Sequence, residues 1–396
     1  MRGLSMLPDL LRDHASICLK AKADFVAKGL PHAKDEAWIY TRLNNVTINP
    51  SSGSDDKAAS APALLSFAGG WLVSDDIDLP AGVTLSEMKD DDSLASFWSY
   101  LPDDHMVTNL SVGHATGAYL IDIEDKVEMT EPLQLVFSSG QEDSSSHPLI
   151  FVRVGRGAKC QIAEIHNSTS GLSAPVLVMK AGEGAQIDHI KLQADAPETM
   201  HLALTICDVA ANCDVNSFTA AIGAGLGRHE THAHLSGESC ELALSSLYLG
   251  RGTQHQDITT KMHHNVPNCT SNQIIRGVLD DTAKGVFQGK VVVARDAQKT
   301  DGQQMSRALL LSRKAEADAK PELEIFADDV VCSHGATVGE LDETHLFYLQ
   351  SRGIDKEEAR NMLIEAFLLD AIEQVRDGAL AEILTGAVQN WMAEGV

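Results

Sequence analysis

The chain has 396 residues and a formal net charge of -25, with 44% hydrophobic and 5% aromatic residues. This length allows one large domain or two to three small ones, and the hydrophobic fraction supplies a sizeable core of mainly aliphatic side chains. The strong negative charge argues against a nucleic-acid backbone or an anionic membrane as the main partner.

Neither a membrane anchor nor a disulfide framework is expected. No apolar run approaches the roughly 20 residues that a transmembrane helix needs, and the N-terminal stretch lacks the apolar region of a signal peptide. The chain has seven cysteines, an odd number. They are dispersed along the sequence, and no two of them form a CxxC motif. These features predict a cytoplasmic protein in a reducing compartment.

The first part of the chain is predicted to be helical and is followed by a linker. Residues 1–50 have apolar positions at helical spacing through LPDLLRDHASICLKAKADFVAKGL, which predicts an N-terminal helical part. The composition of PSSGSDDKAASAP predicts a linker over residues 51–62.

The pattern of residues 63–338 predicts a β region. Short apolar runs such as GAYLIDIED, PLIFVRVG and HLALTICDV are strand-like. Four small-residue tetrads end at Cys160, Ile187, Cys213 and Cys240, at steps of 27, 26 and 27 residues, and each opens a short alternating run. A constant period of this length in a strand-rich chain is typical of a solenoid. We therefore expect a β-helix in which this shared position, occupied by Cys or Ile, faces the core.

Helical spacing returns after Gly339. The segments LDETHLFYLQSRG and DKEEARNMLIEAFLLDAIEQV are predicted helices, and Asp355 with Glu358 fits a capping box at the start of the second. Residues 339–396 are therefore predicted to form a C-terminal helical part. A solenoid needs its ends covered, so helices on both sides of the β region are physically expected.

A histidine-rich stretch offers metal-ligand chemistry. The segment RHETHAHLSGE contains His229, Glu230, His232 and His234, and His255, His263 and His264 follow. His232 and His234 would share one face of a strand, which is an acceptable ligand spacing. The competing interpretation is a polar outer face of the solenoid with adventitious metal affinity at most.

The motifs for nucleotide binding and for hydrolysis are incomplete. GVFQGK (285–290) is one residue short of a phosphate loop, and GAGLG (223–227) is not GxGxxG. No GxSxG occurs, and the acidic pairs are sequence neighbours that would point to opposite faces of a strand. We therefore expect a chain without catalytic residues, and any ATP must be bound by a partner.

Cys332 and His334 make up half of a metal site. In an extended segment their side chains lie on one face, and a thiolate with an imidazole suits iron–sulfur, zinc or copper chemistry. No other Cys or His pair has a matching spacing. Either another chain supplies the remaining ligands or the pair is structural.

Three segments resemble the SufB/SufD family of iron–sulfur cluster assembly proteins. KPELEIFADDVVCSHGATVGELDETHLFYLQSRGI resembles the family's C-terminal signature, and residues 263–312 resemble its core. GLPHAKDEAWIYTRL (29–43), the wording CSHGATVG and the chain length are similar to SufD-type subunits. Val331, Gly302 and Lys314 differ from the residues common at these places in the family, and none of them affects His334.

This resemblance implies a right-handed parallel β-helix flanked by N-terminal and C-terminal α-helical parts. It also implies a scaffold complex in which a SufB-type subunit pairs with residues 290–337 and a SufC-type ABC ATPase binds residues 340–396. ATP-driven closing of the ATPase subunits would expose the interface between the two β-helices. In that interface His334 would be a transient metal ligand for a nascent iron–sulfur cluster, with Cys332 as its neighbour.

The resemblance assigns further expected contacts and cofactors. The ATPase subunit would contact residues of the C-terminal part, namely Leu346, Phe347, Tyr348, Arg352 and Gly353. No cofactor is expected to stay bound, and reduced flavin is a candidate in the complex. The isolated chain is a candidate homodimer.

Two other classes of protein share a β-helix fold. A carbohydrate-active enzyme of the lyase type would need a ladder of Asp, Arg or Lys on one outer face, and the repeat places no such ladder. A homodimeric structural protein would lack a SufB-type partner, so co-purification distinguishes it.

Overall fold

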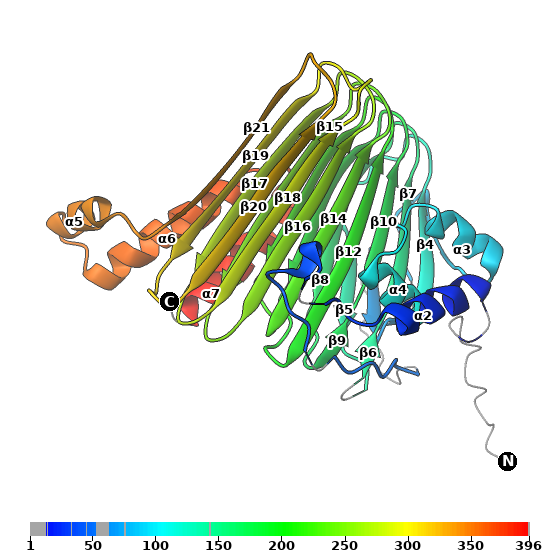
Figure 1. The fold of residues 1–396 in the computed structure, drawn as a ribbon, viewed down its shortest axis with the longest axis horizontal. Coiled ribbons are helices and arrows are strands. Elements are labelled where there is room, and N and C mark those ends of the chain that lie inside the picture. The colour runs from blue at the N-terminus through cyan, green and yellow to red at the C-terminus, as the bar shows by residue number, and fades with distance from the viewer. Residues whose placement is uncertain are drawn as a thin grey trace.

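The computed structural model describes residue 13 and residues 15–394, except 33, 45, 53–62, 75–76 and 142–143. The predicted linker over 51–62 therefore lies almost entirely outside the described residues. The rest of the chain forms a parallel β-solenoid with helices at both ends (Figure 1). The prediction of a mainly β solenoid flanked by helices is confirmed.

One wall of the solenoid, here called sheet 1, contains ten of the described strands, and all neighbours pair in parallel except the short first pair. Across the sheet the strands are β2 (Trp71–Leu72), β1 (Leu64–Ala68), β5 (Leu133–Ser138), β8 (Lys159–His166), β11 (Gln186–Gln193), β13 (Asp214–Ala221), β15 (Glu241–Gly250), β17 (Thr270–Leu279), β19 (Asp301–Leu310) and β21 (Val331–Gly339).

The opposite wall, sheet 2, contains eleven of the described strands. Its order is β20 (Glu316–Ile325), β18 (Lys284–Val293), β16 (His255–His264), β14 (Leu226–Leu235), β12 (Thr199–Val209), β10 (Val176–Ala181), β7 (Pro148–Val154), β4 (Gly117–Ile123) and β3 (Val83–Glu87), with β6 (Ser145–Ser146) and β9 (Gly171–Ser173) to one side. The pair of β3 and β4 is antiparallel, whereas the others are parallel.

Helices cover the outer faces of both walls. The N-terminal group is α2 (Ser16–Lys28), η1 (Glu36–Trp38), α3 (Asp91–Trp98) and α4 (Met106–Gly113), and the C-terminal group is α5 (Glu343–Ser351), α6 (Lys356–Ile372) and α7 (Gly378–Ala393). The N-terminal helices pack on sheet 2 through residues such as Leu110 and Phe151, and α6 and α7 pack on sheet 1 through residues such as Leu368 and Phe218. Strands buried on both faces explain the continuous apolar runs of the sequence.

Two features of the N-terminal helices differ from the prediction. The helices α3 and α4 lie inside the range that the sequence assigns to the β region. Of the predicted helical residues 1–50, those described as helical are α2, the single turn η1 and residue 13. Asp355, in contrast, caps α6 by accepting hydrogen bonds from the N–H groups of Glu357 and Glu358.

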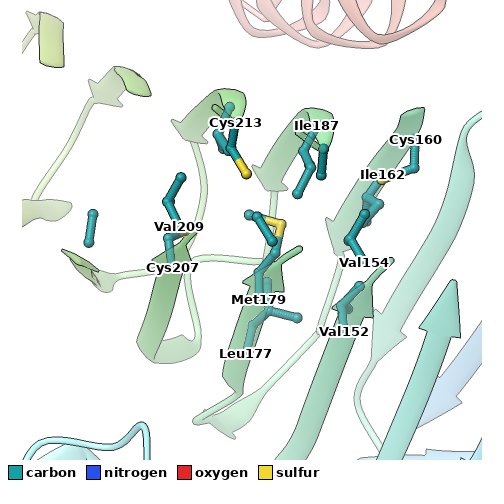
Figure 2. Packing of buried hydrophobic residues seen from close by; sticks show 14 of the residues in the cluster. Val152, Val154, Cys160, Ile162, Leu177, Met179, Ile187, Cys207, Val209 and Cys213 are labelled. Carbon is teal, nitrogen blue, oxygen red and sulfur yellow. The ribbon is translucent and has the colours of Figure 1, made fainter. Parts of the chain in front are cut away.

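The strand pairing observed in sheet 1 differs in one respect from the repeat predicted by the sequence. Cys160 pairs with Ile187, but Ile187 pairs with Val215 and not with Cys213. The offset between paired residues is thus 27 and then 28, and it reaches 31 between Thr270 and Asp301. Cys213 therefore lies two residues before the predicted position. The predicted burial is confirmed, because the cysteines face the lumen between the two walls (Figure 2).

Candidate functional site

The solenoid finishes at β20 and β21, which we call its open end. Within the described residues β20 pairs only with β18, and β21 pairs only with β19. The outer edges of both strands therefore present backbone N–H and C=O groups to solvent, as edge strands do. All of β21 is exposed or half-buried. Strands of another chain could continue both walls at this end.

The two residues of the half-site lie on β21. Cys332 and His334 stand opposite Gly302 and Gln304 of β19, and Gln304 is buried in the lumen. Because side chains alternate along a strand, both residues belong to the lumen side of β21.

Their surroundings differ. Cys332 is half-buried and packs against the lumen core, whereas His334 is exposed. Burial raises the pKa of the Cys332 thiol and outweighs the lowering by a hydrogen bond with the Gly302 backbone. The thiol is therefore protonated at neutral pH in the free chain, and of the two side chains only His334 is exposed.

Apolar side chains surround this end. Val331, Phe326 and Val338 are 65%, 64% and 47% exposed, and Met305 and Ile325 are exposed as well. Exposed large apolar side chains near unpaired strand edges are a feature of protein interaction sites. The open end therefore combines unpaired strand edges with an apolar rim.

The helix α5 carries the residues predicted to contact an ATPase subunit. It projects beyond the solenoid on the side of β20 and β21 (Figure 1). Phe347 and Tyr348 are 71% and 56% exposed, whereas Leu346 is buried. The guanidinium of Arg352 lies over the Tyr348 ring and donates a hydrogen bond to its hydroxyl at 3.2 Å. Gly353 follows with a φ of 92°, which ends the helix.

The histidine-rich stretch divides between two faces of sheet 2. The registers place His229 and His264 on the lumen side, and His232, His234, His255 and His263 on the outer side. His234 and His263 stack with ring centroids 4.7 Å apart. The shared face of His232 and His234 is as the sequence predicts, but the two residues have different neighbours.

His232 belongs to a cluster that sequence spacing could not find. Glu230 Oε1 lies 2.8 Å from His232 Nε2 and 3.1 Å from His105 Nε2. His105 is the N-cap residue of α4, far from the strand in sequence. Burial alone raises the pKa of Glu230, but neighbouring His105 and Arg228 outweigh it and hold the pKa well below its ordinary value. Burial lowers the pKa of His232 to about 4.

A second polar network lies inside the lumen. Glu164 accepts a hydrogen bond from His189 at 2.8 Å and lies 3.4 Å from the ammonium group of Lys191. Burial raises the pKa of Glu164, but Lys191 and hydrogen bonds from His166 and His189 outweigh it, so the carboxyl stays ionised. The compensated carboxylate links β8 to the neighbouring strand β11 on the lumen side of sheet 1.

Two further observations concern the GVFQGK segment and the described helices. GVFQGK lies inside β18 and is therefore strand, not a phosphate-binding loop. None of the helices in the described part of the chain is long and apolar enough to cross a membrane.

Comparison with known proteins decides the family. The family model of the SUF system FeS cluster assembly SufBD core domain matches residues 136–367, more than half of the chain. This chain belongs to the SufBD family. The predicted family membership is confirmed. The match begins in β5 and ends in α6, so it includes the open end and α5.

Individual relatives place the chain within that family. It is 31% identical to the iron–sulfur cluster assembly protein SufD of Escherichia coli over 89% of this chain and 87% of that one. It is 30% identical to a SufBD family protein of Synechocystis, over 87% and 84%. SufD of Bacillus subtilis is 28% identical over 69% and 64%. The chain is thus a SufD-like protein of the SUF iron–sulfur cluster assembly system.

Proposed function

We propose that this SufD-like chain is a non-enzymatic scaffold subunit that pairs with a SufB-type subunit through its open end. The observation that carries the proposal is the unpaired outer edge of each of the two last parallel strands, β20 and β21, near exposed Phe326 and Val331. Two such ends meeting would continue both sheets across the interface and bury the apolar rim. Pairing of backbone groups supplies affinity, and the rim supplies specificity.

His334 is the residue that we propose to act in this interface. It is exposed on the lumen side of the last strand, so a partner ligand across the interface could complete its half-site. A neutral imidazole binds iron and is readily displaced, which suits a scaffold that must release a cluster. Cys332 is half-buried with a raised pKa and would support the packing beneath His334.

The C-terminal helical part is proposed to bind a SufC-type ABC ATPase. Phe347, Tyr348 and Arg352 form an exposed aromatic and cationic surface on a helix that stands off from the solenoid. Such residues are common at the energetic centres of interfaces. ATP-driven movement of the ATPase subunits would then open the paired ends. A part for reduced flavin in the complex and a cytoplasmic location remain predictions.

The experiment that tests this function is complementation in cells lacking the chain's native copy. Wild type, His334→Ala and Cys332→Ala would be compared, with tagged complexes purified in parallel. The matched control is His234→Ala on β14, which is separated from β20 by β16 and β18. We expect His334→Ala to abolish cluster assembly while the SufB-type and SufC-type subunits still co-purify.

Other outcomes identify other functions. Full complementation by His334→Ala would limit the open end to an architectural role. A wild-type chain that purifies only as a homodimer, without a SufB-type partner, would favour the homodimeric structural protein.

A further inference from the structure

We propose that His105, Glu230 and His232 form a binding site for one divalent transition-metal ion, such as Zn²⁺ or Fe²⁺. The ligands would be two imidazole nitrogens and one carboxylate oxygen, a set that suits both metals. The site joins the cap of α4 to the outer face of β14, and β16 and β18 separate it from β20 at the open end. It goes beyond the proposed function and does not depend on it.

The donor atoms already converge. One ligand atom from each of the three residues lies within 4.8 Å of the other two. Glu230 Oε1 is 2.8 Å from His232 Nε2 and 3.1 Å from His105 Nε2. Donors of a tetrahedral zinc site with bonds near 2.1 Å lie about 3.4 Å apart. Small shifts of the two imidazole rings, which cross at an interplanar angle of 76°, would therefore admit an ion.

Neighbouring groups orient the ligands in the way that second-shell partners do. Arg228 Nη2 donates to Glu230 Oε2 at 3.1 Å, which leaves Oε1 directed at the two imidazoles. Nδ1 of His105 accepts from the Thr108 N–H at 3.3 Å and lies equally far from the Thr108 hydroxyl. That hydroxyl can accept a hydrogen bond from Nδ1–H, so the tautomer with a free Nε2 also has a partner.

Solvent can reach the site from two sides. A cavity of about 500 Å³ is lined by His105, Glu230 and Lys261, and a neighbouring cavity of about 550 Å³ is lined by His232 and Lys261. The ion therefore has an entry path and room for a water ligand. The ammonium group of Lys261 lies 3.6 Å from Glu230 Oε1 and its side chain is one-third exposed, so it can move away when a metal cation takes its place.

The alternative is a hydrogen-bonded network that needs no ion. Glu230 is already compensated by Arg228 and by the two histidines, and such a network could simply fasten α4 to β14. The metal site and the ion-free network differ in one measurable property. Only the metal site predicts stoichiometric metal binding that depends on His232 but not on His234, the next outward-facing histidine of β14.

The test uses the full chain carrying His334→Ala, so that the open end does not contribute, after removal of metal by a chelator. Co²⁺ would be titrated and followed by its visible absorption and by calorimetry, and Zn²⁺ would then be added as a competitor. We expect one Co²⁺ per chain, displaced by Zn²⁺. The substitution His232→Gln or His105→Gln should lower the affinity for Co²⁺ at least roughly 100-fold. Loss of a second-shell partner usually lowers metal affinity by less than that.

The matched control is the double variant His234→Gln/His263→Gln, which removes the stacked pair on the same face and should leave affinity within about twofold. Zn²⁺ should raise the melting temperature of the control but not of His232→Gln, because only the folded site binds the ion. Circular dichroism would establish that each variant folds. Absence of saturable binding, or binding lost in the control and kept in His232→Gln, would overturn the proposal.

Discussion

The guanidinium carbon of Arg228 lies 4.1 Å from the centre of the Trp38 indole ring. Arg228 belongs to β14 and Trp38 to the single turn η1, so this contact fastens the N-terminal segment across sheet 2. The same guanidinium pairs with Asp257 and Glu230, and the Thr41 hydroxyl also donates to Asp257. One buried cation thus joins two strands and a segment about 190 residues away in sequence.

We predict that Trp38→Ala lowers the free energy of unfolding by about 3–5 kcal/mol, because it removes a buried indole and its cation–π contact. Residues 29–44 should also become sensitive to proteases. Thermal or urea unfolding and limited proteolysis measure the two effects. Ile39→Ala is the control, because Ile39 is 50% exposed and its loss should change stability by less than about 0.5 kcal/mol. Equal effects of the two variants would contradict the prediction.

Gly277→Ala is expected to destabilise the solenoid by about 1–3 kcal/mol through overpacking. A methyl group at Gly277 would approach the buried Tyr248 ring to 2.1 Å. Gly339→Ala meets nothing within 4 Å and is the control. Adding Tyr248→Leu to Gly277→Ala should recover part of the loss, so the double-mutant cycle should show clear coupling between the two positions. Additive effects would argue against this explanation. Chemical denaturation of the four proteins measures the coupling.

Acidification should weaken the fold partly through His264. Burial lowers the pKa of His264 to about 4, although the negative charge of Asp301 acts to raise it. The unfolded chain, with an ordinary histidine pKa near 6.5, therefore binds more protons between about pH 6.5 and 4, and stability falls as the pH drops through that window.

The size of this effect is at most about 3 kcal/mol. His264→Gln should keep a hydrogen bond to Ser271 and reduce the loss of melting temperature between pH 7 and pH 4.5. The exposed His345→Gln should leave that loss unchanged. Identical pH profiles for wild type and His264→Gln would rule out this contribution.

Phe347→Ser should weaken binding of a SufC-type ATPase at least about tenfold while leaving the melting temperature unchanged, because the ring is 71% exposed. Val26→Ser is the control, since Val26 is equally exposed at 74% but belongs to α2 at the other end. Binding measured by calorimetry with the purified ATPase subunit decides the matter. Equal affinities of the two variants for the ATPase subunit would show that Phe347 is not part of the binding surface.

The solenoid could be predicted because its turns have nearly constant length and each strand is apolar towards the lumen. The detailed register could not, because the offset between paired residues of successive turns varies between 26 and 32 residues, and the strand sequences carry no signal for it. The sequence pattern therefore aligns Ile187 with Cys213, whereas its partner in the structure is Val215.

The proposed half-site of Cys332 and His334 could be predicted because its members are neighbours in sequence. The cluster of His105 with Glu230 and His232 could not, since a helix cap and a strand from distant parts of the chain meet only after folding. The same holds for the contact of Trp38 with Arg228.

The two ends of the solenoid differ, and the difference limits growth. At the start, β2 and β3 run antiparallel to their neighbours and end the parallel pattern. At the other end, β20 and β21 are parallel strands to which further parallel strands can be added. A molecule can therefore join a second molecule head to head through its long parallel edges, and the edges then left in the described part of either chain are the two-residue β2 and the antiparallel β3. Strand addition then stops at a pair, where a symmetric solenoid would polymerise into a fibre.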